Sequence, residues 1–292
     1  MPDSTIKINE RQQTNEYMKL YIARHFAICT GMKLLVVQTN PVFGDKKSNL
    51  ESIDELIGDQ KADLIILPEL CTTGYQFMNR KQLADLSETT NGATCRYFGE
   101  LASRTNSHVV AGFAEKDDDR LFNSALMAGP GEIKGIYRKV HLFDKEKLLF
   151  DKGDLGFSVF SAGEIPIGMM VCFDWIFPES ARSLALAGAQ IIAHPANLVL
   201  PHCQNAIITR ALENHVFIAT ANRIGVEGNG PEKLVFTGRS RVVSPSGRVL
   251  ADGPSGTQAV MAVEINPGEA ADKHITSRND LFDDRRPSQY KL

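Results

Sequence analysis

The sequence predicts an α/β fold in which short apolar strands alternate with amphipathic helices. Strand-like apolar runs lie at 34–38, 62–68, 108–113, 123–129, 165–172, 190–195, 216–222, 238–245 and 259–265. Helical spacing of apolar residues is found at 46–60, 94–106, 178–188 and 203–214. Strands this apolar are usually covered on both faces, and their alternation with helices is typical of layered α/β proteins.

Turn residues separate several of these strands. Gly129-Pro130-Gly131 follows one predicted strand, and the stretch 244–247, Ser-Pro-Ser-Gly, follows another. Both predict hairpins that join neighbouring strands. The stretches ADLIILPEL and AQIIAHPAN also share a pattern that aligns Pro68 with Pro195. This similarity indicates either two pseudo-equivalent halves or a chance likeness between two core strands.

Composition limits the class of protein. The 292 residues are 43% hydrophobic and carry a formal net charge of -3, which suits one large globular domain or two small ones. There is no basic stripe, which argues against nucleic acid as a partner. No apolar run approaches the roughly 18 residues of a membrane span, so we expect no membrane partner either.

The cysteines indicate a reducing compartment. They are scattered with no CxxC pair, at Cys29, Cys71, Cys95, Cys172 and Cys203. An odd number at irregular spacing argues for free thiols in the cytoplasm, and against structural zinc or a disulfide scaffold. We expect no metal.

The first 31 residues differ from the rest. They are polar and mixed in charge, and the apolar patch that ends them is broken by Arg24 and His25, so it does not match a secretory signal. Met32 then opens a clean strand. We therefore expect one domain over 32–292 and an N-terminal extension over 1–31. The extension is either poorly anchored or an artefact of an upstream start, and the alternative is a tethering or interface role.

Cys172 ends the apolar run IPIGMMVC directly before the predicted helix at 178–188. An isolated cysteine is most often a buried core residue. A thiol at a strand end before a helix, however, lies near unpaired N–H groups and a positive helix dipole, which lower a thiol pKa. We expect a thiolate there, although both interpretations of Cys172 stay open from its context alone.

A nucleophilic cysteine needs a base. The histidines available to it, none of them in a marked motif, are His141, His194, His202 and His215. The stronger candidate is Glu69 in LIILPELCTTGY, because a glutamate directly after an apolar strand is held at the rim of the core. The alternative for Glu69 is an ordinary solvated loop acid.

Lys139 stands in an alternating, strand-like run from Ile136 to Leu142, on one face with Tyr137 and His141. Most lysines are surface residues, so this segment alone is weak evidence that Lys139 belongs to an active site. Glu146 could supply a second carboxylate to the same site, or be an exposed acid of the run DKEK.

Three motifs in this order are Glu69 in LPEL, Lys139 in YRKVHLF and Cys172 in CFDWIFPES. Together they resemble the carbon–nitrogen hydrolase (nitrilase) superfamily. The resemblance runs from Met32 to the C-terminus and includes the stretches QTNPVFGDKKSNL, RALENHVFIATANR and GRSRVVSPSGRVL. Within the superfamily the sequence is similar to aliphatic nitrilases of the archaeal, thermophile type.

The resemblance implies a four-layer α-β-β-α sandwich and a Glu-Lys-Cys triad. By correspondence of motifs, Cys172 would be the nucleophile, Glu69 the general base and acid, and Lys139 the stabiliser of the oxyanion. Glu146 would position the substrate, and the N–H of Phe173 would complete the oxyanion hole. The implied enzyme needs no cofactor and pairs as a homodimer or larger homo-oligomer through the segments FPESARSLALAG and RALENH.

The expected reaction is hydrolysis of a small aliphatic nitrile or amide to the acid and ammonia, through an acyl group on Cys172. Relatives that bind a substrate carboxylate often have an arginine three or four residues after the cysteine, where this chain has Trp175 and Ile176. We therefore expect an apolar pocket for a neutral substrate, unless Arg138 or Arg182 replaces that arginine, or Trp175 only packs between layers.

Other functions remain open at this point. Within the hydrolases they are an N-carbamoyl amine amidohydrolase, similar to N-carbamoylputrescine amidase, and an ω-amidase. Outside the hydrolases they are a catalytically silent binding protein and an acyl transferase. Loss of a triad residue would indicate the binding protein, and all three are present.

Overall fold

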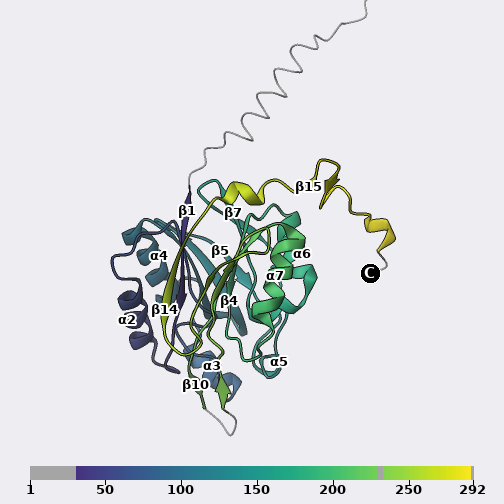
Figure 1. Cartoon of the computed structure of the whole chain (residues 1–292). Coiled ribbons are helices and arrows are strands. Elements are labelled where there is room, and N and C mark those ends of the chain that lie inside the picture. The colour runs from purple at the N-terminus through teal and green to yellow at the C-terminus, as the bar shows by residue number, and fades with distance from the viewer. Residues whose placement is uncertain (1–30, 229–232, 291–292) are drawn as a thin grey trace, which may run out of the picture. The chain divides into compact units, whose positions relative to one another are not determined.

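Two mixed six-stranded β-sheets pack against each other at the centre of the molecule (Figure 1). The computed structural model describes residues 31–228 and 233–290, so the extension expected over 1–31 lies, except for Gly31, outside the described residues. The first sheet has the order β14 (Ala259–Ile265), β1 (Met32–Gln38), β2 (Leu64–Ile66), β3 (His108–Asp117), β4 (Arg120–Gly129) and β5 (Glu132–Arg138). The second has the order β13 (Val249–Asp252), β12 (Arg241–Val243), β9 (Phe217–Ala221), β8 (Ile191–Pro195), β7 (Ile165–Met169) and β6 (Val159–Ala162).

The two sheets have equivalent centres. In the first, β2 pairs in parallel with β1 and β3, and in the second, β8 pairs in parallel with β7 and β9. The stretches ADLIILPEL and AQIIAHPAN supply β2 and β8, respectively. Their sequence similarity therefore corresponds to two pseudo-equivalent halves, which is the first of the two interpretations above.

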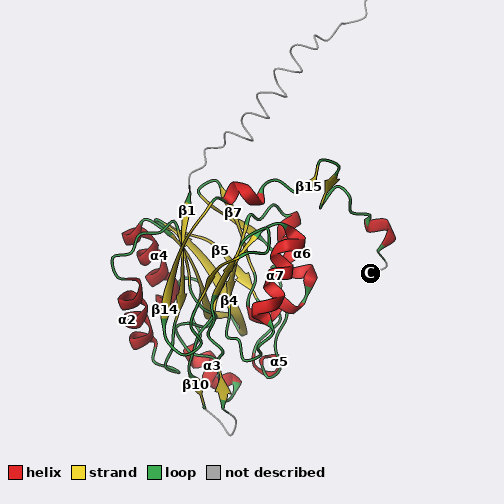
Figure 2. Cartoon of the chain, in the orientation of Figure 1, coloured by secondary structure: helices red, strands yellow, loops and turns green. Residues whose placement is uncertain are grey.

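Helices cover the outer face of each sheet (Figure 2). On the first sheet lie α2 (Lys46–Ile57) and α4 (Ala93–Thr105), and on the second lie α6 (Pro178–Leu186) and α7 (Cys203–Asn214). The residues of strand β1 explain why the outer face needs helices. Leu34 and Val36 pack into the core between the sheets, while Leu35 and Val37 pack with Phe98 of α4. Alternate residues of a strand point to opposite faces, so both faces are buried. The four-layer α-β-β-α sandwich is confirmed.

The predicted hairpins are present. Strands β4 and β5 are antiparallel neighbours on either side of Pro130-Gly131, and β12 and β13 flank the turn at 244–247. The strand expected at 238–245 is shorter, because Gly238 and Arg239 have φ of 59° and 55° and bend the chain before β12 begins.

Several short elements are absent from the sequence-based prediction. They are α3 (Arg80–Leu86), α5 (Glu146–Leu149), β10 (Val226–Glu227), β11 (Leu234–Val235), β15 (His274–Thr276), β16 (Asn279–Asp280) and the 3-10 helices η1 (Cys172–Ile176), η2 (Pro267–Ala270) and η3 (Pro287–Gln289). Elements this short lack enough residues to show a period. In the part of the chain that the structure describes, no helix has the length and apolarity to span a membrane.

Candidate active site

Cys172 lies just after β7, at the first residue of η1, and has a left-handed backbone with φ of 44°. This conformation costs a non-glycine residue about 1 kcal/mol or more, so its surroundings must hold it. Two contacts do so. The backbone N–H of Val171 donates to Oδ2 of Asp174 at 2.8 Å, and Nε2 of His194 lies 3.0 Å from the carbonyl oxygen of Cys172.

His194 is a neutral donor to this turn. Burial lowers its pKa from 6.5 to about 4. Because a carbonyl oxygen can only accept, the proton lies on Nε2, and Nδ1 accepts from the hydroxyl of Thr220 at 3.0 Å. His194 therefore holds the backbone of Cys172, and both of its ring nitrogens are used in hydrogen bonds to groups other than the sulfur.

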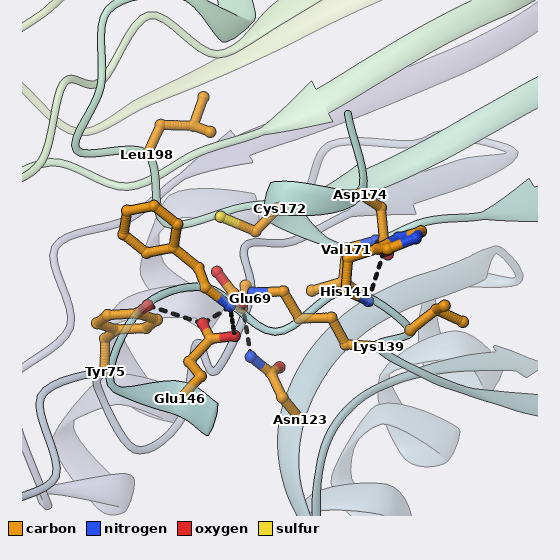
Figure 3. Close-up of polar contacts among 12 residues, drawn as sticks. Glu69, Tyr75, Asn123, Lys139, His141, Glu146, Val171, Cys172, Asp174 and Leu198 are labelled. Carbon is orange, nitrogen blue, oxygen red and sulfur yellow. Dashed lines mark hydrogen bonds and ion pairs between the residues drawn. The ribbon is translucent and has the colours of Figure 1, made fainter. Parts of the chain in front are cut away.

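Lys139 joins two carboxylates in a fully buried cluster (Figure 3). Its Nζ lies 2.7 Å from Oε1 of Glu69 and 2.8 Å from Oε1 of Glu146. Burial alone would lower the pKa of Lys139, but the charges of Glu146 and Glu69 outweigh it and raise the pKa above its ordinary value. Lys139 is thus a permanent buried cation, and neither glutamate is the exposed acid of the alternative interpretation.

Three different elements bring these residues together. Glu69 follows β2 at the end of the first sheet, Lys139 comes directly after β5, and Glu146 begins α5. The strand-like run around Lys139 is thus shorter than expected, because β5 ends at Arg138. Figure 3 shows Cys172 next to Glu69 and Lys139, where it enters from the second sheet.

The thiol of Cys172 is protonated in the resting protein, which corrects the expectation of a thiolate. Burial and the carboxylate of Glu69 raise its pKa well above the ordinary value, and they outweigh Lys139 and the backbone N–H of Asn197, which lower it. The helix α6, whose dipole was expected to favour the anion, begins at Pro178 as predicted, but η1 separates it from Cys172. A base must therefore remove the proton when the sulfur reacts.

Asn123 orients Glu69, and the sequence-based prediction missed it. Its Nδ2 donates to Oε1 of Glu69 at 2.6 Å, and Oε1 also accepts from Lys139. Oε2 of Glu69 is buried and has no hydrogen-bond partner within the described ranges. One oxygen is thus held by two donors and the other is left free to accept a proton. A polar residue at the start of the apolar run NSALMAG was the available signal.

Tyr75 orients Glu146 and was also missed. Its hydroxyl donates to Oε1 of Glu146 at 2.7 Å, while the backbone N–H of Phe143 donates to Oε2 at 2.9 Å. Burial raises the pKa of Glu146 and the charge of Lys139 lowers it. Burial is the larger effect, so the pKa of Glu146 lies above its ordinary value. The backbone N–H of Tyr75 is in turn held at 2.9 Å by Glu227, which pairs with the buried Arg223.

Asp174 connects the cysteine turn with the strand that leads to Lys139. Besides Val171, it accepts from the hydroxyl of Tyr137 at 2.6 Å and lies 2.8 Å from Nδ1 of His141. His141 is therefore a partner of Asp174. His202 and His215 lie at either end of α7. The structure shows no hydrogen bond between any of these histidines and the sulfur, which leaves Glu69 as the candidate base.

A narrow pocket opens at Cys172. Its walls are mostly apolar and include Phe143, Phe173, Trp175, Leu198, Val199 and Leu200. The space open to water in it is only about 20 Å³, little more than one water molecule occupies. Phe173 and Trp175 both line this pocket, and Trp175 also packs into the core between the sheets.

Ile176 does not line this pocket, contrary to its expected position, and its side chain is 41% exposed. Neither arginine replaces the missing cation. Arg138 is paired with Glu115, and Arg182 donates to the carbonyl oxygen of Glu213 at 2.6 Å. The described residues that line this pocket thus include no charged side chain. Nor does the described chain hold any group of three His, Cys, Asp or Glu side chains that could bind a metal.

The fold and this cluster define a hydrolase of the α-β-β-α sandwich class, and comparison with known proteins identifies the family. Residues 33–274 match the family model described as carbon-nitrogen hydrolase. A nitrilase of Pyrococcus abyssi is 43% identical over 263 residues, which are 89% of this chain and 99% of that protein. An (R)-stereoselective amidase of a Pseudomonas species is 33% identical over 87% of this chain and 92% of that one.

A solved structure agrees with the fold. The crystal structure of an amidase from Nesterenkonia sp. superimposes with a TM-score of 0.75 at 28% identity, and the match covers 88% of this chain and 94% of that chain. This chain belongs to the carbon–nitrogen hydrolase family. It is a hydrolytic enzyme of the nitrilase and amidase superfamily.

Proposed function

We propose that the enzyme hydrolyses a small, neutral aliphatic amide or nitrile to the carboxylic acid and ammonia. The observation that carries this proposal is the oxygen Oε2 of Glu69, which is buried, unpaired within the described part of the chain and close to the protonated thiol of Cys172. The apolar pocket without an arginine supports a neutral substrate, because a buried charge without a partner costs several kcal/mol.

In the first half of the reaction, Oε2 of Glu69 removes the proton of the Cys172 thiol as the sulfur attacks the carbonyl carbon. The ammonium of Lys139 and the backbone N–H of Phe173 stabilise the negative oxygen of the tetrahedral intermediate. One such donor typically contributes about 3 kcal/mol. The start of η1 supports this role for Phe173, because the first N–H groups of a helix have no intrahelical acceptor.

Glu69 then returns its proton to the substrate nitrogen, the C–N bond breaks and ammonia leaves a thioester on Cys172. In the second half, Glu69 takes a proton from water, and the hydroxide attacks the thioester. The acid leaves and the thiol is restored. A nitrile would first form a thioimidate, which adds water before ammonia leaves. Glu146, fixed by Tyr75 and Lys139, positions the substrate.

A panel of short amides, nitriles and N-carbamoyl amines, scored by ammonia release, tests this proposal. Cys172→Ala should abolish release from every substrate that the wild type accepts. Cys203→Ala is the matched control, because Cys203 is also a buried free thiol but lies on α7. If Cys172→Ala kept its activity, the proposal would be wrong. Release of carbon dioxide with ammonia would favour the N-carbamoyl amine alternative.

We also propose a homodimer or larger homo-oligomer. Large apolar side chains are exposed on the helices expected to pair, with Leu186 at the end of α6 and Leu212 on α7. The C-terminal segment supports the same proposal. Its described residues after η2 form β15, β16 and η3, expose Ile275 and Tyr290, and extend away from the sandwich (Figure 1).

For the domain boundaries, we propose a hydrolase domain over 32–292 preceded by an extension over 1–31. The start of the family match at residue 33 and the compact packing of the chain from Met32 support this division. For localisation, we propose the cytoplasm. The free thiols of Cys71, Cys95, Cys172 and Cys203 support it, because such thiols persist in reducing compartments.

A further inference from the structure

Asn197 carries a buried side-chain amide with nothing to bind. It follows β8 and is 3% exposed. Neither its Oδ1 nor its Nδ2 has a hydrogen-bond partner among the residues that the structure describes, and no other described side chain has two such atoms. An unpaired buried polar group is costly, and native structures retain few of them. Such a group at an enzyme site indicates a ligand.

The neighbouring Asn222 shows that the fold can satisfy a buried asparagine. Its Oδ1 accepts from the backbone N–H of Leu198 at 2.8 Å, and its Nδ2 donates to the hydroxyl of Thr237 at 3.1 Å. Both polar groups of the Asn222 side chain are thus hydrogen-bonded within the protein, and they hold the loop that follows β8. The unpaired amide of Asn197 in the same loop does not have that structural role.

The position of Asn197 places this amide at the reacting group. Asn197 lines the pocket that holds Cys172 and is the one carboxamide side chain in its otherwise mostly apolar wall. Its backbone N–H also interacts with the sulfur of Cys172. A ligand whose carbon is attacked by that sulfur therefore lies next to Asn197.

The amide presents one acceptor and one donor group, which a primary carboxamide complements. The NH₂ of a substrate amide can donate to Oδ1, and the oxyanion of the tetrahedral intermediate has a third lone pair for Nδ2 beside those used by Lys139 and Phe173. A nitrile offers only an acceptor nitrogen and no donor, so it leaves Oδ1 unpaired. The bond to Oδ1 also strengthens as the leaving nitrogen is protonated, which favours the transition state.

We propose that Asn197 recognises the carboxamide of the substrate, and that primary amides are preferred over nitriles of the same carbon skeleton. This assignment rests on the proposed function, since it names the substrate class of the same site. A substrate-recognition role also predicts an effect on the free enzyme: an apolar residue of similar size removes a buried unpaired group without breaking any bond inside the protein.

The test compares wild type, Asn197→Leu and Asn197→Ser on propionamide and propionitrile. We expect wild type to prefer the amide. Asn197→Leu should lower kcat/KM for propionamide roughly tenfold to hundredfold and change propionitrile turnover less than about threefold. Asn197→Ser, which keeps a small donor and acceptor, should fall in between on the amide. Leu198→Met changes the same wall without altering its polarity and should affect both substrates alike.

Thermal unfolding of the free variants separates recognition from a structural role. We expect Asn197→Leu to unfold at the wild-type temperature or above it. A lower Tm together with equal losses on both substrates would show that the amide serves the fold, and would overturn the assignment. Equal losses at unchanged Tm would overturn the amide preference. If wild type released ammonia from neither substrate, the proposed function itself would fail and this assignment with it.

Discussion

Gly112 on β3 controls where Glu69 lies, and a single methyl group there tests the geometry of the site. The loop carrying Glu69 crosses Gly112 closely: the backbone N–H of Gly112 donates to the carbonyl oxygen of Pro68 at 3.0 Å, and its own carbonyl accepts from Cys71 at 3.1 Å. A Cβ added at Gly112 would lie 2.4 Å from Cα of Glu69 and 2.7 Å from the backbone nitrogen of Leu70. The atoms it meets are backbone, so a rotamer change cannot relieve the clash.

Gly112→Ala must therefore move the loop. Ordinary contact begins at 3.4 Å, so Cα of Glu69 has to withdraw by 3.4 − 2.4, or about 1 Å. A misplacement of that size costs roughly a hundredfold in rate, and overpacking of this kind destabilises a protein by about 1–3 kcal/mol. We expect kcat to fall about a hundredfold while the far-UV circular dichroism spectrum of the folded protein is retained.

Steady-state ammonia release by Gly112→Ala and by Gly99→Ala provides the comparison. Gly99 lies inside α4, and no atom lies within 4 Å of the Cβ that alanine would add. Gly99→Ala should keep the wild-type kcat and gain up to about 1 kcal/mol in stability, since alanine favours a helix. A Gly112→Ala enzyme with wild-type kcat would refute this reasoning. It would mean either that catalysis tolerates a shift of Glu69 or that the loop carrying Glu69 does not pack closely against β3.

Three further experiments test other parts of the account. Glu69→Gln should lower kcat by several orders of magnitude with substrate binding largely kept, because glutamine cannot carry a proton; near-normal rates in this variant and a loss in Glu146→Gln would show that the two roles are reversed. The pKa of His194 is about 4 in the folded protein and 6.5 in the unfolded chain. The folded state therefore favours the neutral imidazole, and this contribution to the free energy of unfolding is fully present above pH 6.5 and is lost as the pH falls through 4. His194→Gln should remove roughly 3 kcal/mol of that pH dependence, measured by urea unfolding at pH 7 and pH 4; an unchanged dependence would contradict this pKa. Light scattering at micromolar concentration should give at least a dimer, and a fully active monomer would exclude the proposed pairing.

The fold was predictable because its signals are local. Alternating apolar runs and helical spacing place β1, α2, α4 and α7 within a few residues of their observed bounds. Elements of two to four residues, such as α5 and β10, carry no period and escape prediction. The pocket wall was predicted only in part. Ile176 was expected at the pocket from its spacing to Cys172, but the tight 3-10 turn after Cys172 leaves Ile176 outside it.

The site residues were predictable where a motif contains them and unpredictable where a long-range contact defines them. Asn123 reaches Glu69 across 54 positions, and Tyr75 reaches Glu146 across 71. A single sequence gives no sign of such pairings. The protonated state of Cys172 was missed for a related reason: its pKa is raised by burial within the folded protein and by the carboxylate of Glu69 from the other sheet.

The central claim is that the sulfur of Cys172 carries the acyl group during turnover. Mass spectrometry of wild type and Glu69→Gln, quenched with acid during turnover of a slowly hydrolysed amide, tests it directly. Peptide mapping should place the acyl mass on the peptide that contains Cys172, with no such mass on those of Cys71, Cys95 or Cys203. An adduct on one of those other thiols, or turnover by Cys172→Ala, would contradict the account.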